Sequence, residues 1–204
     1  MDDIVLEGRL VRLEPLGERH IEGLVAAAAD RSAYQWTFVP ATTDEAARYV
    51  ATARAWQSEG SALPFAIVRR DDDRVIGSTR FWNLERWAWP AGHPRHGRNA
   101  PDAGEIGHTW LARSAIRTGI NGEAKTLLLT FAFETWDVLR VCLHTDARNE
   151  RSRAAIGRLG ATFEGTLRSH RLAPDQTPRD SARFSIIAAE WPAVRERLGG
   201  LARD

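Results

Sequence analysis

Hydrophobic and polar residues alternate with a period of two in some segments of the chain and follow helical spacing in others. Alternating segments rich in β-branched and aromatic residues are typical of strands, whereas apolar residues three and four positions apart indicate a helix packed on one face. These patterns predict strands over residues 8–15, 63–70, 74–82, 105–112, 139–146, 162–172 and 180–189. They predict helices over residues 20–29, 41–56, 116–134, 149–160 and 191–200.

The order of these elements favours an α/β (α+β) architecture, a sheet of about seven strands with helices on both faces. A tight turn at Asp71–Asp73 joins two of the strands, so we expect a hairpin there. No repeat or linker divides the sequence, and we expect a single domain over residues 1–204. A chain of 204 residues is long enough to bury a core without disulfides or metal.

The composition is that of a globular protein, with 43% hydrophobic and 27% charged residues. A formal net charge of +1 argues against a large nucleic-acid surface, which normally shows a basic stripe. Cys142 is the only cysteine, which excludes an intramolecular disulfide and indicates a reducing compartment. The sequence shows neither a signal-peptide pattern nor an apolar run long enough to cross a membrane. We therefore expect a cytoplasmic protein without membrane or nucleic-acid partners.

The segment from Glu105 to Gly160 carries the most information about chemistry. A strand over residues 105–112 is followed by a turn at Thr118–Gly122 and then by an amphipathic helix. Glycine lets the backbone approach a ligand closely, and the free N–H groups at a helix start bind anions. The turn therefore predicts a phosphate-binding site, although the same glycines can serve only to form a turn.

The strand over residues 105–112 carries two groups that can transfer protons. Strict alternation places Ile106, His108, Trp110 and Ala112 on one face of the sheet, and Glu105 on the other. One end of the strand thus presents Glu105 beside His108. A glutamate at a strand end is usually just solvated, however, and a histidine on a sheet face is often a core residue.

Polar residues open the last helix of this segment. Asn149 is a good N-cap and Gly160 is a good C′ residue for a helix over residues 149–160. That structural interpretation of Asn149 competes with a catalytic one. Ser152 lies one turn into the helix, where a serine is unremarkable by itself.

As a set, these residues resemble the GCN5-related N-acetyltransferase superfamily and, within it, the RimJ/RimL-like branch of ribosomal-protein N-terminal acetyltransferases. The turn over Ile116–Asn121 is similar to the superfamily's Q/R-x-x-G-x-G/A motif for the pyrophosphate of acetyl-coenzyme A. Asn149-x-x-Ser152 followed by Arg158-Leu159-Gly160 resembles the branch's N-x-x-S…K/R-L-G ending, and the next strand resembles G-F-x-x-E-G-x-x-R. Two positions depart from the motif, because Ile116 replaces Gln/Arg and Asn121 replaces the second small residue.

The resemblance implies a mixed, mostly antiparallel sheet whose splayed central strands hold acetyl-CoA, with no metal. Acetyl-CoA would be bound by residues of the strand, the turn and the last helix. These are Trp110, Leu111, Ala112, Arg117, Thr118, Gly119, Ile120, Asn121, Gly122, Asn149 and Ser152. The implied chemistry is direct attack of a substrate amine on the thioester, without a covalent enzyme intermediate.

The resemblance also suggests catalytic residues. Many family members use a tyrosine seven residues after the motif asparagine as the general acid, but this chain has Ile156 there. In the RimL-like branch the serine takes that role, which corresponds to Ser152, with Asn149 as its motif partner. Serine would act by hydrogen-bonding the sulfur or relaying a proton. We expect Glu105 to be the base, acting through water, with His108 as the second choice.

A long loop over residues 83–104 is rich in Pro, Gly, His and Arg, and loops of this length tend to be functional or mobile. We expect Trp36, Trp82 and Trp87, with His108, to shape a groove for an amine or a peptide. A self-packed loop or a dimer contact is the alternative. The H-P-R-H run at residues 93–96 lacks the helix and the third ligand that a zinc site would need.

Taken together, the sequence predicts an N-acetyltransferase that uses acetyl-CoA and acts on a protein N-terminal α-amine or a small amine. A non-catalytic acyl-CoA sensor on the same fold is the alternative, which Ile116 and the missing tyrosine make credible. A Rossmann-type enzyme fits poorly, because no G-x-G-x-x-G follows the first strand. The acceptor and the size of the acyl group stay open, and family analogy makes a homodimer plausible.

Overall fold

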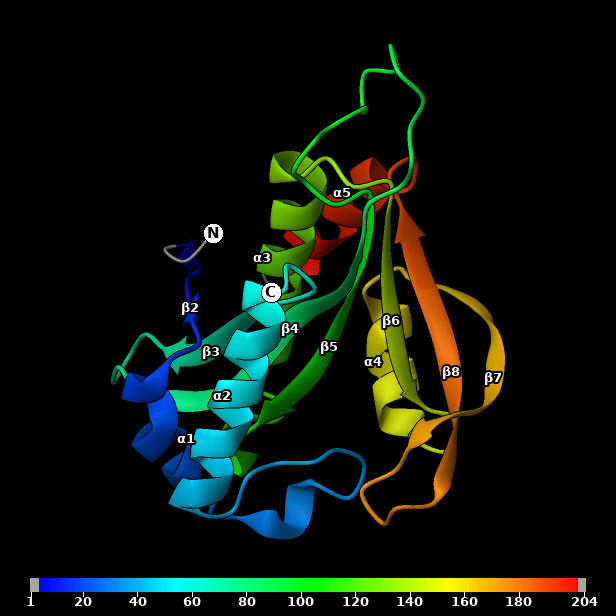
Figure 1. Cartoon of the computed structure of the whole chain (residues 1–204). Helices are drawn as coiled ribbons and strands as arrows, with labels where there is room; N and C mark the ends of the chain where they lie inside the picture. Colours follow the sequence, from blue (N-terminus) through cyan, green and yellow to red (C-terminus); the bar gives the residue numbers. More distant parts are fainter. Residues whose placement is uncertain (1–3, 202–204) are drawn as a thin grey trace.

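An eight-stranded sheet runs through the molecule in the order β1-β2-β3-β4-β5-β6-β8-β7 (Figure 1). The computed structural model describes residues 4–201, so the first and last three residues of the expected domain lie outside the described part. The strands are β1 Leu6–Glu7, β2 Val11–Pro15, β3 Leu63–Arg69, β4 Val75–Glu85, β5 Ala103–Leu111, β6 Arg140–Asp146, β7 Thr162–Leu172 and β8 Pro178–Ile187. The α-helices are α1 Ile21–Ala27, α2 Thr43–Ser58, α3 Ile120–Thr130, α4 Glu150–Arg158 and α5 Trp191–Leu201. Shorter helical turns are Glu18–His20, Arg31–Ala33, Arg113–Ala115 and the π-helical Phe131–Thr135.

All neighbouring strands pair antiparallel except β5 and β6, which are parallel. The predicted α/β architecture with a mixed, mostly antiparallel sheet is therefore confirmed. The predicted hairpin is confirmed as β3 and β4. The additional strand is β1, whose two residues are too few to show an alternating pattern.

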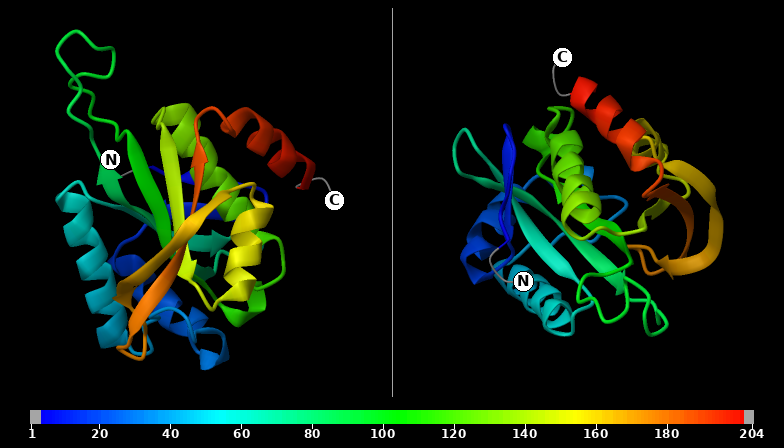
Figure 2. Two further views of the ribbon diagram at one scale, coloured as in Figure 1. Left: turned by 90° about the vertical axis from the view of Figure 1, so that its right-hand side faces the viewer. Right: turned by 90° about the horizontal axis from the view of Figure 1, so that it is seen from above.

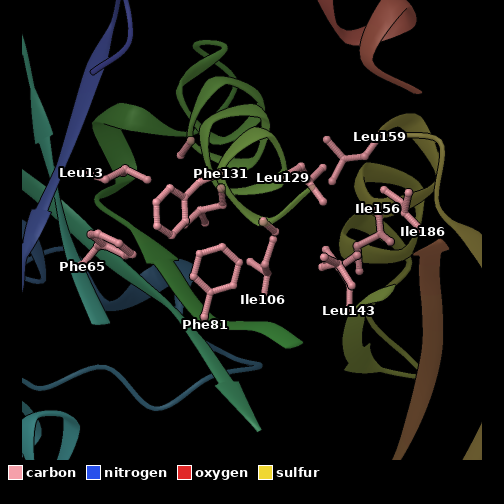
Figure 3. Packing of buried hydrophobic residues seen from close by; sticks show 14 of the residues in the cluster. Leu13, Phe65, Phe81, Ile106, Leu129, Phe131, Leu143, Ile156, Leu159 and Ile186 are labelled. Atoms are coloured by element: carbon pink, nitrogen blue, oxygen red, sulfur yellow. The ribbon is translucent and has the colours of Figure 1, made fainter. Parts of the chain in front are cut away.

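Helices cover both faces of the sheet (Figure 2). The face that carries α1 and α2 is called the α2 face, and the face that carries α3, α4 and α5 is called the α3 face. The larger core lies on the α3 face, where Phe81, Ile106 and Leu129 point toward one another (Figure 3). A smaller core on the α2 face includes Leu24 and Val50. No helix within residues 4–201 is both long enough and apolar enough to cross a membrane.

The two central strands β5 and β6 separate partway along their length. Their pairing runs from Ala103 opposite Arg140 to Glu105 opposite Cys142, and no further pair joins them. Beyond this point the strands diverge (Figure 1), which agrees with the expected splayed central strands. We call the space between the diverging strands the β5–β6 gap. The carboxyl end of β5 leads to α3 and that of β6 leads to α4, so both helices begin on the same side of the gap.

A β-bulge in β5 changes which side chains share a face. Gly107 pairs with Arg80 and Trp110 pairs with Ser78, so β5 has one more residue than β4 between these pairs. The bulge falls at His108, whose φ is 50°. Ile106 consequently packs in the core of the α3 face, whereas Trp110 packs in the core of the α2 face. The prediction that Ile106, His108, Trp110 and Ala112 share one face was wrong, because the bulge interrupts the period of two.

Candidate active site

The turn between β5 and α3 presents a row of free backbone N–H groups. The chain is left-handed at Arg117 (φ 65°) and at Gly119 (φ 83°), and α3 begins at the next residue. Among the described residues, the N–H groups of residues 117–122 have no intramolecular acceptor, and the Thr118 hydroxyl donates back to the Ala115 carbonyl. N–H groups and the helix dipole attract anions at such a helix start. The turn can therefore hold a diphosphate through its backbone, and it does not need the side chain of Ile116.

Glu123 holds this turn against the rest of the domain. Its carboxylate accepts hydrogen bonds of 2.9, 2.7 and 2.9 Å from the backbone N–H groups of Arg9, Leu10 and Val11. These bonds connect the first turn of α3 to the start of β2. Nothing in the sequence indicated these contacts, because the partners of Glu123 are more than a hundred positions away.

The backbone of β5 beyond its last pair with β6 lines one side of the gap. Three residues here were expected to hold the pantetheine arm, and their groups are not all free. The Ala112 N–H donates to the Ile76 carbonyl at 2.7 Å, and the Leu111 carbonyl accepts from the Tyr34 hydroxyl at 3.2 Å. The strand edge at Trp110 and Leu111 still faces the gap, since β6 no longer pairs with it. Trp110 and Leu111 are thus placed beside the gap, and Ala112 lacks a free N–H.

The start of α4 lies at the end of the other strand that borders the gap. The Asn149 side-chain oxygen accepts from the Ser152 N–H at 3.0 Å, so Asn149 is the N-cap of α4. Gly160 has φ of 95° immediately after the helix, as its C′ role requires. Within residues 4–201 the Ser152 hydroxyl has no hydrogen-bond partner, so it is available to a ligand.

Glu105 lies on the α2 face, at the point where β5 and β6 separate. Its carboxylate is 3% exposed and binds the Arg171 guanidinium through two hydrogen bonds, of 3.1 and 2.9 Å. His144 Nδ1 lies 2.9 Å from Glu105 Oε2. Burial alone raises the pKa of the Glu105 carboxyl, but the hydrogen bonds from His144 and Arg171 outweigh burial and lower it to about 2. At neutral pH this carboxylate is ionised and a weak base.

A bulge in β7 directs Arg171 toward Glu105. Leu167 pairs with Ser181 and Arg171 pairs with Arg179, so β7 has two more residues than β8 in this interval. Ser169, with φ of 47°, lies inside the bulge. The hairpin of β7 and β8 curls at this end of the sheet (Figure 2). Sequence periodicity could not predict this contact, because β8 and β6 lie between β7 and β5 in the sheet.

A cavity of about 140 Å³ opens beside Glu105 on the α2 face. Its lining residues come from β4, β5, β6, β7 and β8. They are Asn83, Glu85, Gly104, Glu105, Cys142, His144, His170, Arg171 and Arg183. His144, His170 and Arg171 were not among the predicted site residues, because no local pattern in the sequence distinguishes them. No three His, Cys, Asp or Glu side chains within residues 4–201 are grouped so that they could hold a metal ion.

His108 and Trp82, two expected substrate-binding residues, lie together beside this cavity. Their rings are 4.5 Å apart, and Trp56 of α2 lies 5.6 Å from the His108 ring. The Arg171 guanidinium lies 4.1 Å from the centre of the Trp82 ring. Burial, followed by the charge of Arg80, lowers the pKa of His108 to about 3. His108 is therefore a neutral packing residue near pH 7, which makes it a poor choice for the base.

The other two expected substrate-binding residues, Trp36 and Trp87, do not line the cavity. The Trp36 ring lies 5.2 Å from the guanidinium of Arg148, just before α4. Trp87 lies in the loop over residues 86–102, where Asp102 accepts hydrogen bonds from the Trp87 N–H and from the Trp89 indole. Trp89 in turn stacks on His93 at 4.1 Å. These contacts agree with the alternative of a self-packed loop.

Comparison with known proteins places this geometry in a family. Residues 10–162 match the model of the acetyltransferase (GNAT) domain. The chain is 34% identical over 87 residues to the provisionally named ribosomal N-acetyltransferase YdaF of Bacillus subtilis, covering 43% of this chain and 46% of that protein. It is 24% identical over 140 residues to the ribosomal protein uS5-alanine N-acetyltransferase of Escherichia coli, covering 69% of this chain and 65% of that protein. The chain thus spans about half to two thirds of the length of these curated relatives.

A solved structure extends the likeness over nearly the whole chain. RimJ of Mycobacterium smegmatis, solved in complex with CoA-disulfide, has a TM-score of 0.78 over 98% of this chain and 92% of that one, at 23% identity. At that identity the likeness shows the fold. The family model, by contrast, matches far more than half of the chain. The protein therefore belongs to the acetyltransferase (GNAT) domain family.

Proposed function

We propose that the protein transfers an acetyl group from acetyl-CoA to a primary amine, by direct attack of the amine on the thioester. One observation carries this proposal: the β5–β6 gap has an anion-binding turn at one side and a polar cavity at its apex. The turn lies at the N-terminus of α3, and the cavity lies beside the last β5–β6 pair at Glu105. A donor held by its phosphates at the turn would thus bring its thioester to the cavity.

The residues present fit coenzyme A at the turn. The free N–H groups of residues 117–122 supply donors for a diphosphate, as described above. A Cβ placed on Gly122 would meet nothing within 4 Å, so the first turn of α3 is open on that side. Arg117 follows Ile116 and brings a positive charge to the same turn. RimJ of Mycobacterium smegmatis was solved in complex with CoA-disulfide, and this supports coenzyme A as the ligand of the turn.

Acetyl transfer requires that the thioester carbonyl is polarised and that the departing thiolate receives a proton. Backbone groups at the unpaired edge of Trp110 and Leu111 would position the pantetheine arm and the thioester. Ser152 would donate its free hydroxyl to the sulfur, and Asn149 fixes Ser152 by capping α4. Acetyl-CoA itself supplies the activated acyl group.

The acceptor would approach from the α2 face, through the cavity. The names of both curated relatives describe N-acetyltransferases that act on ribosomal proteins, which supports a protein N-terminal α-amine as the acceptor. A cavity of about 140 Å³ suits the first residue of a peptide or a small amine. Trp82 lies at this site and would contact the acceptor.

Mass spectrometry of reaction products tests the proposal. Purified protein is incubated with acetyl-CoA and four acceptors: a hexapeptide with a free N-terminal alanine, the same peptide with a blocked terminus and one internal lysine, spermidine and free alanine. We expect acetylation of at least one α-amine or small amine well above the rate without protein. Release of coenzyme A at the background rate with all acceptors would contradict catalysis. Tight coenzyme A binding under those conditions would favour an acyl-CoA sensor instead.

A further inference from the structure

His144 occupies the apex of the β5–β6 gap. The last residue pair of the two strands is Glu105 with Cys142. Side chains alternate along a strand, so His144 is the next β6 side chain on the same face as Cys142. The corresponding position on β5 is Gly107, which has no side chain to fill the apex. His144 is consequently the β6 side chain closest to the apex, where it would face a thioester or an amine bound in the gap.

Glu105 and Arg171 fix the orientation of His144. Nδ1 of the imidazole lies 2.9 Å from Glu105 Oε2. Arg171 already binds both oxygens of the same carboxylate, so a guanidinium balances its charge. An imidazole whose single proton is on Nδ1, facing that carboxylate, keeps its lone pair on Nε2.

Nε2 of His144 is the atom available for chemistry. Both ring nitrogens are buried without a well-aligned hydrogen bond among the described residues, but Nδ1 already lies against a carboxylate oxygen, which leaves Nε2 for a ligand. The His144 side chain is only 6% exposed, yet it lines the cavity. A buried ring nitrogen without a partner is costly, because it loses its bond to water without replacement. Such an atom beside a cavity is what a base for a bound amine requires.

We propose that His144 is the general base of the reaction and that Glu105 is its positioning residue. This inference rests on the proposed acetyl transfer and names the proton acceptor within the same site. Nε2 takes one proton from the ammonium form of the acceptor, and the neutral amine then attacks the thioester carbonyl carbon. A C–N bond forms and the C–S bond breaks. The second amine proton leaves to solvent, and the thiolate takes a proton from the Ser152 hydroxyl, which regains one from solvent.

His170 provides an exit for the proton that His144 has taken. The centres of the two imidazole rings are 5.1 Å apart, and Nδ1 of His170 is also buried without a partner. Both rings line the same cavity. Charged and titratable groups from β4, β5, β6, β7 and β8 line this cavity with His144, and the charge of Arg179 acts on His170. The lining groups are Glu85, Glu105, Cys142, His170, Arg171 and Arg183.

The two other candidates are weaker bases. The pKa of Glu105 is lowered to about 2 by its partners, despite burial. The pKa of His108 is lowered to about 3, chiefly by burial. A base is most effective when its pKa lies near the working pH. His108 also packs between Trp56 and Trp82 and does not line the cavity.

Variants at His144 and Glu105 test the assignment in acetyl transfer from acetyl-CoA to a hexapeptide with a free N-terminal alanine. His144→Gln should lower kcat by about 100-fold at unchanged KM for acetyl-CoA. Glu105→Gln should lower kcat less than His144→Gln does, at unchanged KM for acetyl-CoA, because the imidazole stays in the gap but loses the carboxylate that orients it. The matched control is His20→Gln, since His20 is also a buried histidine, 3.1 Å from a glutamate, and lies outside the cavity. Unchanged kcat in a folded His144→Gln variant would overturn the proposal.

Nitrogen NMR of the histidine rings provides a readout that does not need turnover. In 15N-labelled protein the neutral form of His144 should carry its proton on Nδ1, and the population of this tautomer should fall in Glu105→Gln. A neutral His144 with its proton on Nε2 would overturn the proposal whether or not any amine is acetylated. If the tautomer is as expected and no acceptor reacts, the acetyl transfer itself is contradicted, while the Glu105–His144 arrangement stands.

Discussion

Replacing Lys125 by methionine should stabilise the protein. Lys125 is the only lysine of the chain, and it points from α3 into the core with 6% of its surface exposed. Its ammonium nitrogen lies 2.5 Å from the Thr109 hydroxyl and 3.4 Å from the Thr79 hydroxyl, and no carboxylate binds it within residues 4–201. Burial lowers the pKa of Lys125 from 10.5 to about 7.

The size of the effect follows from the two pKa values. Between pH 7 and pH 10.5 the unfolded chain binds a proton that the folded chain does not bind, so stability rises with pH across this window. The cost of burying the charged amine is complete well below pH 7, where it amounts to about 5 kcal/mol; it is about 4 kcal/mol at pH 7 and vanishes above pH 10.5. Methionine keeps the apolar stem but loses the hydrogen bond to Thr109, which contributes about 1 kcal/mol. We therefore expect a net gain of about 3 kcal/mol at pH 7.

Urea unfolding of the wild type and Lys125→Met at several pH values between 6 and 10 measures this gain. The difference between the two proteins should be largest at pH 6 to 7 and should shrink as the pH approaches 10. Arg158→Met is the matched control, because it removes one positive charge from an exposed position at the end of α4. Its effect should stay within about 0.5 kcal/mol at all pH values. Equal stability of wild type and Lys125→Met at pH 7, or a gain that does not change with pH, would refute the reasoning.

Three further substitutions test the coenzyme A-binding turn, the carboxylate that holds it and the N-cap of α4. Gly119→Ala should raise the Kd for coenzyme A about tenfold in calorimetry, because alanine strains the left-handed conformation (φ 83°) that orders the turn; an unchanged Kd would argue against the turn as the anchor. Glu123→Ala should lower the unfolding free energy by about 2 kcal/mol in urea and weaken coenzyme A binding, since three backbone N–H groups lose their acceptor. Asn149→Ala should lower the unfolding free energy by about 1 kcal/mol, whereas Asn149→Asp, which can also cap α4, should lower it by much less; equal losses would contradict the capping role.

The long periodic elements could be predicted from the sequence because their pattern is local. The strands β3 to β8 and the helix α3 each show their period within a dozen residues. The turn at Gly119 was predictable for the same reason, since its glycine, its helix and its motif are contiguous. Asn149 and Gly160 were recognisable as caps because capping depends on the residue type at a helix end.

The cluster of Glu105, His144, His170 and Arg171 could not be predicted, because bulges and sheet order create it. The bulge at His108 separates side chains that strict alternation places together. The bulge around Ser169 brings Arg171 to Glu105 from a strand that is not adjacent to β5. Neither bulge leaves a periodic signal in the sequence. Glu105 was therefore recognised as a functional candidate, but its two partners and its low pKa were not.

The central claim is that the acetyl group moves from acetyl-CoA to an amine bound at the apex of the β5–β6 gap. The most direct measurement quantifies acetylated peptide and free coenzyme A in the same reaction, using the hexapeptide with an N-terminal alanine. We expect equal amounts of the two products, with the acetyl group on the α-amine, and a large loss of both in His144→Gln. Free coenzyme A without acetylated peptide, or equal product in wild type and His144→Gln, would contradict this mechanism.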